Sequence, residues 1–244
     1  MQARMNAVRT RISVAAQAAG RRTDDVALLA VSKTFPADAV LAAIAAGQRS
    51  FGENYVQEAV EKMGEVARRL PGPPVHWHFI GPIQSNKTRQ IAAQFDWVES
   101  LDRAKIAERL SEQRPAHLAP LQVLLQVNIG GEPTKGGVAP GEVVALARAV
   151  AQLPGLRLRG LMAIPPPEAD PARQRRSFAQ VRRVFEDLRE QLQDPLRTVP
   201  GGPADAGRAA ADTLSMGMSG DLEAAIAEGT TQVRVGTAIF GERS

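Results

Sequence analysis

The chain of 244 residues suits one large domain or two small ones, and 44% apolar and 23% charged residues are typical of a globular protein. The absence of cysteine excludes disulfides, thiolate nucleophiles and cysteine-ligated zinc, and it fits a cytoplasmic location. A net charge of only +4 with scattered arginines, and 4% aromatic residues, argue against nucleic-acid binding. The sequence contains no run of about 18 apolar residues, so it predicts no membrane span.

The chain begins with a predicted helix and continues with a strand and a second helix. Residues 1–22 place arginines on both sides of a short apolar patch, which favours an amphipathic helix over a signal peptide. Residues 26–31 form an apolar run typical of a strand buried on both faces. The alanine-rich segment 37–46 predicts the next helix, which Gly47 ends.

The same strand-then-helix unit then repeats along the chain. Further strands are predicted at 50–54, 76–80, 96–100, 121–128, 156–164, 213–216 and 232–237. Helices between them are predicted at 56–70, from about 85, and at 103–113, 141–152, 171–192 and 220–227. Residues 194–212 are rich in Pro, Gly and Ala and predict a loop. Eight such units predict one domain over 1–244, a single (β/α)8 TIM barrel with an extra N-terminal helix; an open doubly wound sheet is the alternative.

Lys33 is the first candidate functional residue, because active sites of such barrels lie at the carboxyl ends of the strands. Alternation places it on the same face as Leu29 and Val31, so its amine enters the mouth of the barrel if that face points inward. Loss of water there lowers the pKa of an amine and frees it to form an imine with a carbonyl. A solvated lysine at a strand end is the alternative.

Arg234 is the second candidate. It lies on the last predicted strand, on the face opposite Val233 and Val235, which suit the helix layer, so we expect it to point inside the barrel. A guanidinium keeps its proton and can donate to an unprotonated ring nitrogen. Pairing with a glutamate of the barrel is the alternative.

The ends of the last two strands predict an anion site. Ser215, Gly236 and Thr237 offer hydroxyls, small side chains and backbone N–H groups in the loops where barrels hold phosphate. Helix capping by Ser219 is the competing explanation, and it accounts for Ser219 but not for the small residues on both loops.

Two other polar positions allow alternatives. Asn54, after the second strand, either donates to a ring oxygen of a ligand or caps the next helix. His76 and His78 share one face of the third strand, but no acidic ligand is predicted beside them, so we expect no metal site.

Six segments, in order, carry a resemblance to one family. They are LLAVSKTFPADAV, FGENYVQEAVEK, HWHFIGPIQSNK, VNIGGEPTKGGV, GLMAI and SMGMSGDLEAAIAEGTTQVRVGTAIFG. Together they span nearly the whole chain and are more specific than any short motif. On these segments the chain resembles the YggS/PROSC-like pyridoxal-phosphate homeostasis proteins, which are related in fold to the barrel domain of bacterial alanine racemase.

The resemblance implies a monomeric barrel that carries pyridoxal 5'-phosphate (PLP) as a Schiff base on Lys33. Arg234 would then face the pyridine nitrogen, and Asn54 would lie near the ring. The phosphate would be held by Ser215, Gly236 and Thr237.

The resemblance also implies a role in buffering PLP and delivering it to apo forms of PLP-dependent enzymes, without established turnover. It raises Lys135, in the glycine-rich loop, as a candidate for a secondary site. The chain departs from the family pattern in the Pro/Gly/Ala insertion at 195–212, directly before the seventh strand.

A PLP-dependent enzyme such as an amino-acid racemase is the alternative function, and it would also use Lys33. Racemisation needs acid and base groups on both faces of the cofactor, and in alanine racemases a second domain supplies one as a tyrosine. We predict no such domain, and the only tyrosine is Tyr55. Arginine at the ring nitrogen also weakens the electron sink. An aldolase-like Schiff-base enzyme for a sugar phosphate is a third hypothesis, which the resemblance disfavours.

Overall fold

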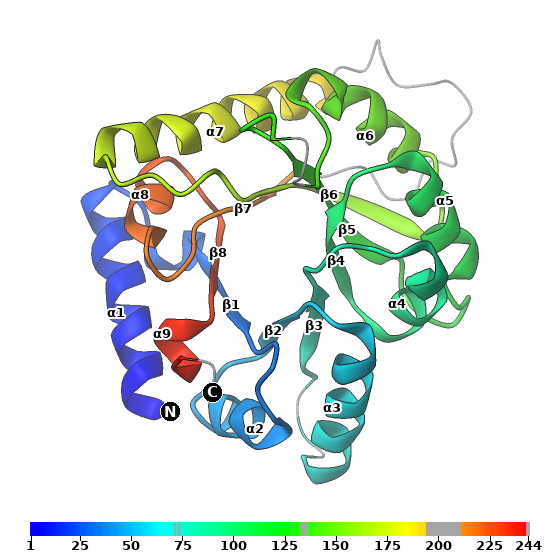
Figure 1. Cartoon of the computed structure of the whole chain (residues 1–244), viewed down its shortest axis with the longest axis horizontal. Helices are drawn as coiled ribbons and strands as arrows, with labels where there is room; N and C mark the ends of the chain where they lie inside the picture. The colour runs from blue at the N-terminus through cyan, green and yellow to red at the C-terminus, as the bar shows by residue number, and fades with distance from the viewer. Residues whose placement is uncertain (71, 73, 133–135, 194–210, 243–244) are drawn as a thin grey trace.

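The computed structural model describes residues 1–242 apart from 71, 73, 133–135 and 194–210, and these residues form a barrel (Figure 1). Eight parallel strands follow one another around it in chain order, and β1 pairs with β8 to close it. The strands are β1 (Ala27–Val31), β2 (Ser50–Glu53), β3 (His76–Phe79), β4 (Trp97–Leu101), β5 (Leu121–Val127), β6 (Leu156–Ala163), β7 (Thr213–Ser215) and β8 (Gln232–Val235). The predicted (β/α)8 TIM barrel is confirmed.

Helices surround the strands as an outer ring (Figure 1). They are α1 (Gln2–Ala18), α2 (Ala37–Ala45), α3 (Val56–Arg69), α4 (Thr88–Gln94), α5 (Ala104–Gln113), α6 (Val143–Ala151), α7 (Pro171–Gln193), α8 (Leu222–Ala227) and α9 (Thr237–Phe240). The extra N-terminal helix α1 packs against α8 and α9 and covers the closure between β1 and β8. Among the described residues, no helix is both long and apolar enough to cross a membrane.

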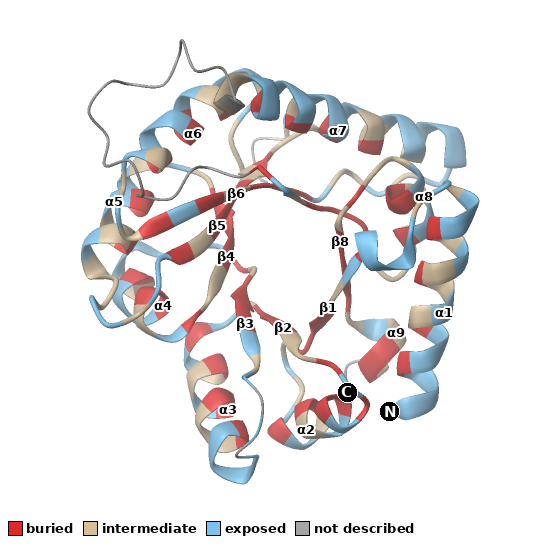
Figure 2. Cartoon of the chain, turned by 180° about the vertical axis from the view of Figure 1, so that it is seen from behind, coloured by how far each residue is buried: buried red, intermediate tan, exposed pale blue. Residues whose placement is uncertain are grey.

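Each helix buries one face against the strands, as Figure 2 shows by the red bands on the inner side of the ring. In α3 the buried apolar residues are Val56, Ala59, Met63 and Val66, which recur at the spacing of one helical face. All four residues of β8 and five of the seven residues of β5 are buried, as expected for parallel strands with helices outside and side chains inside the barrel. The apolar runs in the sequence therefore become strands, and the amphipathic segments become helices.

The strand register sets which side chains enter the barrel. Leu29 of β1 pairs with Arg234 of β8, and both point inward, as alternation predicts. Gly160 in β6 has φ +143°, and a Cβ there would lie 2.0 Å from the carbonyl oxygen of Thr213. Only glycine lets β7 approach β6 this closely.

The end of the last strand differs from its prediction. We expected 232–237 to be a strand, but β8 ends at Val235 and Thr237 begins the short helix α9. Gly236 turns the chain between them, and Phe240 of α9 stacks on Phe35 with ring centroids 5.1 Å apart. This apolar contact draws the chain over the mouth of the barrel, which local strand propensity does not reveal.

Candidate functional site

A cavity of about 260 Å³ opens at the carboxyl ends of the strands. Its wall comes from the loops after β1, β2, β3, β6, β7 and β8, which are the positions where barrels of this kind place their sites. The lining residues are Val31, Lys33, Phe35, Asn54, Ile80, Met162, Ile164, Met218, Ser219, Gly220, Arg234, Gly236, Thr237 and Gly241. The structure thus brings together five of the six predicted site residues.

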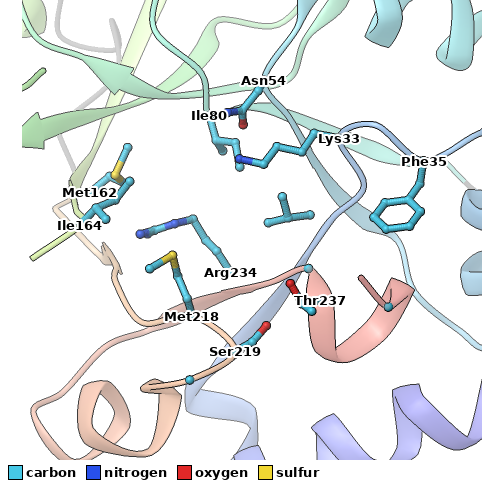
Figure 3. Close-up of a pocket in the computed structure, with 14 residues that line it drawn as sticks. Lys33, Phe35, Asn54, Ile80, Met162, Ile164, Met218, Ser219, Arg234 and Thr237 are labelled. Carbon is cyan, nitrogen blue, oxygen red and sulfur yellow. The ribbon is translucent and has the colours of Figure 1, made fainter. Parts of the chain in front are cut away.

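Lys33 lies two residues after the end of β1, and its side chain extends into the cavity (Figure 3). Asn54, just after β2, points into the same space from the neighbouring loop. The Oδ1 atom of Asn54 is buried and has no hydrogen-bond partner among the described residues. A buried acceptor without a donor is costly, so this atom is ready to receive an N–H or O–H group from a ligand.

Arg234 enters the cavity from below (Figure 3), and its side chain is 4% exposed. One guanidinium nitrogen, Nη1, donates to Ser215 Oγ at 2.7 Å, and the other, Nη2, donates to the Ala163 carbonyl at 2.9 Å. Burial lowers the pKa of the guanidinium, and the nearby carboxylate of Glu99 opposes this shift. A guanidinium stays protonated through shifts of this kind, so the cavity has a fixed positive charge on its floor.

Glu99 of β4 is the counter-charge of Arg234, and it lies inside the barrel with no exposed surface. Its carboxylate accepts hydrogen bonds from His78 Nδ1, Ser215 Oγ and Gln232 Nε2, each at 2.7 Å. Burial alone would raise the pKa of this carboxyl, but the hydrogen bond from His78 and the nearby charges lower it overall. Glu99 is therefore an ionised group that fixes the floor of the cavity.

Ser215 lies beneath the cavity and does not line it. Its hydroxyl bridges Arg234 and Glu99 and is fully buried. The phosphate contact expected for Ser215 stays a prediction, and its hydroxyl already bonds to both Arg234 and Glu99. Ser219, four residues further on, is at the cavity wall and accepts a hydrogen bond from the backbone N–H of Ala238 at 3.4 Å.

The side of the cavity nearest α9 suits an anion. Thr237 and Ser219 have hydroxyls on the wall, and Gly236 and Gly220 leave their backbone uncovered by side chains. The first turn of a helix also has N–H groups without acceptors inside the helix. Lys33 and Arg234 are the charged side chains among the lining residues, which include no carboxylate, so the cavity attracts a dianion.

Sequence reasoning missed the pair formed by His78 and Glu99. We expected no acidic group beside His78, yet Glu99 lies 2.7 Å from it, and His78 also stacks on Trp97 with ring centroids 5.1 Å apart. His76 is on the exposed end of the same strand. Glu99 lies on the neighbouring strand β4, at a position whose side chain points into the barrel, and this could have indicated the pair. Recognising it requires the register of β3 with β4, which the sequence alone does not give.

Two predictions fall outside the described residues. Lys135, the candidate for a secondary site, is one of the residues that the structure does not describe, and the insertion at 195–212 is described only at 211 and 212. Asp212 there makes an ion pair with Arg159 at 2.7 Å, at the end of the barrel opposite the cavity.

Comparison with known proteins agrees with this geometry. The family model of the alanine racemase N-terminal domain matches residues 4–244. A protein of Pseudomonas aeruginosa named pyridoxal phosphate homeostasis protein is 58% identical over 97% of this chain and 93% of its own length. The protein of the same name from Escherichia coli is 51% identical over 97% and 94%.

A solved structure is similar as well. PipY of Synechococcus elongatus with PLP bound has a TM-score of 0.76 and 38% identity, over 94% of this chain and 100% of the PipY chain. The resemblance found in the sequence is therefore confirmed. The chain belongs to the family of the alanine racemase N-terminal domain, among the relatives that bear the name pyridoxal phosphate homeostasis protein.

Proposed function

We propose that this protein binds PLP in the cavity at the carboxyl ends of the strands and acts in PLP homeostasis. The observation that carries the proposal is the meeting of Lys33 and Arg234 in one cavity, without a carboxylate among the lining residues. The name of the 58% identical relative and the PLP bound to PipY support it.

The residues present fit this cofactor. The cavity of about 260 Å³ is slightly smaller than the range of roughly 300–1,000 Å³ that is typical of small-ligand pockets. The unpartnered Oδ1 of Asn54 can accept a hydrogen bond from the hydroxyl group of the pyridine ring. A Cβ at Gly236 would lie 3.2 Å from the Val31 carbonyl, so a larger residue there would press on the end of β1, beside Lys33.

Each polar residue of the cavity then has a role. When bound, PLP supplies an aldehyde on an electron-withdrawing ring. Lys33 would provide the amine for a Schiff base with this aldehyde, and Arg234 would donate an N–H to the ring nitrogen and keep it unprotonated. Ser219, Gly236 and Thr237 would hold the phosphate through hydroxyls and backbone N–H groups.

A carrier role fits the cavity better than racemisation. Racemisation needs a second acid-base group on the face of the cofactor opposite the lysine. Among the lining residues, Lys33 is the one side chain suited to exchange a proton, since Arg234 keeps its own. Tyr55 is 55% exposed and is not part of the cavity wall.

The proposal extends to four finer points. We infer that the chain works as one domain, that it is a monomer in the cytoplasm, and that it delivers PLP to apo forms of PLP-dependent enzymes. Sedimentation of the holoprotein tests the monomer. Mixing holoprotein with an apoenzyme, and following the activity that the apoenzyme gains, tests delivery.

The central experiment is reduction of the PLP-loaded protein with borohydride, followed by peptide mass spectrometry. We expect the reduced cofactor on Lys33, and no covalent label at this site in Lys33→Ala. A label on another lysine, or a protein that takes up no PLP, would contradict the proposal. Incubation of holoprotein with an amino acid tests the enzyme alternative, which sustained racemisation beyond the amount of protein would establish.

A further inference from the structure

A second lysine, Lys62 of α3, lies behind the wall of the cavity on the outer side of the barrel. Its side chain is 4% exposed, and its ammonium donates to Glu53 Oε1 at 2.7 Å, to Glu58 Oε1 at 2.8 Å and to the Ser32 carbonyl at 2.9 Å. An ammonium has three N–H groups, so all of them are used. Lys62 is therefore a structural cation and not a second amine for a carbonyl ligand.

Lys62 and Glu53 together hold Ser32, the residue that precedes Lys33. The backbone carbonyl of Ser32 accepts from Lys62, and the Ser32 hydroxyl donates to Glu53 Oε1 at 2.7 Å. Glu53 is the last residue of β2 and is fully buried. Both the backbone and the side chain of Ser32 are thus fixed from behind.

The third partner holds the residue that follows Lys33. Glu58 Oε1 accepts a hydrogen bond from the backbone N–H of Thr34 at 2.7 Å. Thr34 has φ +69° and is the one described residue other than glycine with positive φ. This conformation is unfavourable for a β-branched residue and persists only where its surroundings fix it. The turn after β1 therefore depends on Glu58, which Lys62 in turn holds in place.

We propose that Lys62, together with Glu53 and Glu58, positions Lys33 for imine formation by clamping Ser32 and Thr34 on either side of it. The inference rests on the proposed function and adds residues to it that do not line the cavity. A misplacement of about 1 Å can slow a reaction on the order of 100-fold, so a fixed backbone on both sides of the amine affects the rate of attack.

The alternative is that the cluster only stabilises the fold. It predicts that a variant loses covalent and non-covalent binding in parallel, because both need a folded cavity. A positioning role predicts that the rate of imine formation falls while the binding of a ligand without an aldehyde is kept. Pyridoxine 5'-phosphate is such a ligand, since it has the ring and the phosphate of PLP but an alcohol in place of the aldehyde.

The test compares Glu58→Ala and Lys62→Met with wild type. Stopped-flow absorbance gives the rate of imine formation with PLP, and calorimetry gives the dissociation constant of pyridoxine 5'-phosphate. For Glu58→Ala we expect the rate to fall at least about tenfold and the dissociation constant to stay within about twofold. Glu58 is half-buried, so this variant keeps the inference testable if Lys62→Met does not fold.

Two controls complete the test. Glu58→Gln keeps an acceptor for the Thr34 N–H and should restore most of the rate. Glu61→Ala, on the exposed face of α3, should match wild type in both measurements. An unchanged rate in folded Glu58→Ala, or a parallel loss of both kinds of binding, would overturn the inference. A wild-type protein that forms no imine would instead contradict the proposed function itself, and the inference with it.

Discussion

Two fully buried carboxylates, Glu99 and Glu53, lie on opposite sides of the barrel wall and differ in the direction of their pKa shifts. Glu99 faces the interior beneath the cavity, and its pKa is lowered. Glu53 faces α3, and burial raises its pKa although Lys62 and Ser32 act against the shift. Equal exposure therefore does not give equal acidity.

The number of donors explains the difference. Three hydrogen bonds from His78, Ser215 and Gln232 reach both oxygens of Glu99, and the charge of Arg234 adds to them. In Glu53 only Oε1 accepts hydrogen bonds, from Lys62 and Ser32, while Oε2 has no partner among the described residues. A buried carboxylate stays ionised when its donors repay the lost hydration, and it otherwise tends to take up a proton.

The largest effect is expected for Glu99→Gln. This change leaves the buried guanidinium of Arg234 without its counter-charge, because the carboxamide has no charge of its own. The free energy of unfolding should fall by about 3–5 kcal/mol at neutral pH, measured by denaturant unfolding. The surface change Glu61→Gln is the control, for which we expect a change below about 0.5 kcal/mol. A loss for Glu99→Gln as small as that of the control would mean that Arg234 is hydrated or paired elsewhere.

Lys62→Met should have a smaller effect, because Glu53 can take up a proton when its partner is removed. We expect a loss of about 2–3 kcal/mol at pH 7 that shrinks as the pH is lowered, because burial raises the pKa of Glu53 and a neutral Glu53 no longer needs a cation. Unfolding measured at neutral and at lower pH checks this. A loss that stays constant with pH would show that the hydrogen bonds to Ser32 and Glu58 matter more than the charge of Glu53.

The two carboxylates should also give opposite slopes of stability against pH. The lowered pKa of Glu99 means that its contribution is present above the ordinary carboxyl pKa and is lost as the pH falls through the folded-state pKa. The raised pKa of Glu53 means that the folded protein holds this proton more tightly, so stability is lost as the pH rises through its folded-state pKa.

Unfolding of wild type, Glu99→Gln and Glu53→Gln between about pH 4 and 8 separates the two contributions. Relative to wild type, Glu99→Gln should lose least at the acid end. Glu53→Gln should lose least at the alkaline end. Parallel curves for the two variants would contradict the opposite shifts.

The fold was predictable because its signals are local. Apolar runs and amphipathic segments alternate eight times, and the parity of residues along a strand was enough to place Lys33 and Arg234 in the barrel. What failed depended on several strands at once. The bridge from Ser215 to Glu99 joins β7 to β4, and the pair of His78 with Glu99 joins β3 to β4, so neither follows from one segment of sequence.

Two other features of the site also lay beyond the sequence. Threonine is not a residue type that signals positive φ. At Thr34 this conformation is fixed by a hydrogen bond to Glu58, 24 positions away, which the local sequence does not reveal. The sequence placed Ser215 at the end of the seventh strand, but it could not show whether its hydroxyl lines the cavity or bonds to groups beneath it. The number of layers in a barrel follows from the stagger of its strands, which pattern alone does not fix.

The smallest effects are expected from removing the serine hydroxyl that donates a hydrogen bond to each carboxylate, Ser32 for Glu53 and Ser215 for Glu99. Ser32→Ala should lower the free energy of unfolding by only about 1 kcal/mol, because Lys62 still donates a hydrogen bond to Glu53 Oε1. Ser215→Ala should cost about 2 kcal/mol, because its hydroxyl joins two charged groups, Arg234 and Glu99. Neither change should weaken the binding of inorganic phosphate, measured by calorimetry, since Ser215 lies below the cavity wall. Ser219→Ala should weaken it, so a stronger effect of Ser215→Ala than of Ser219→Ala would return Ser215 to the phosphate site.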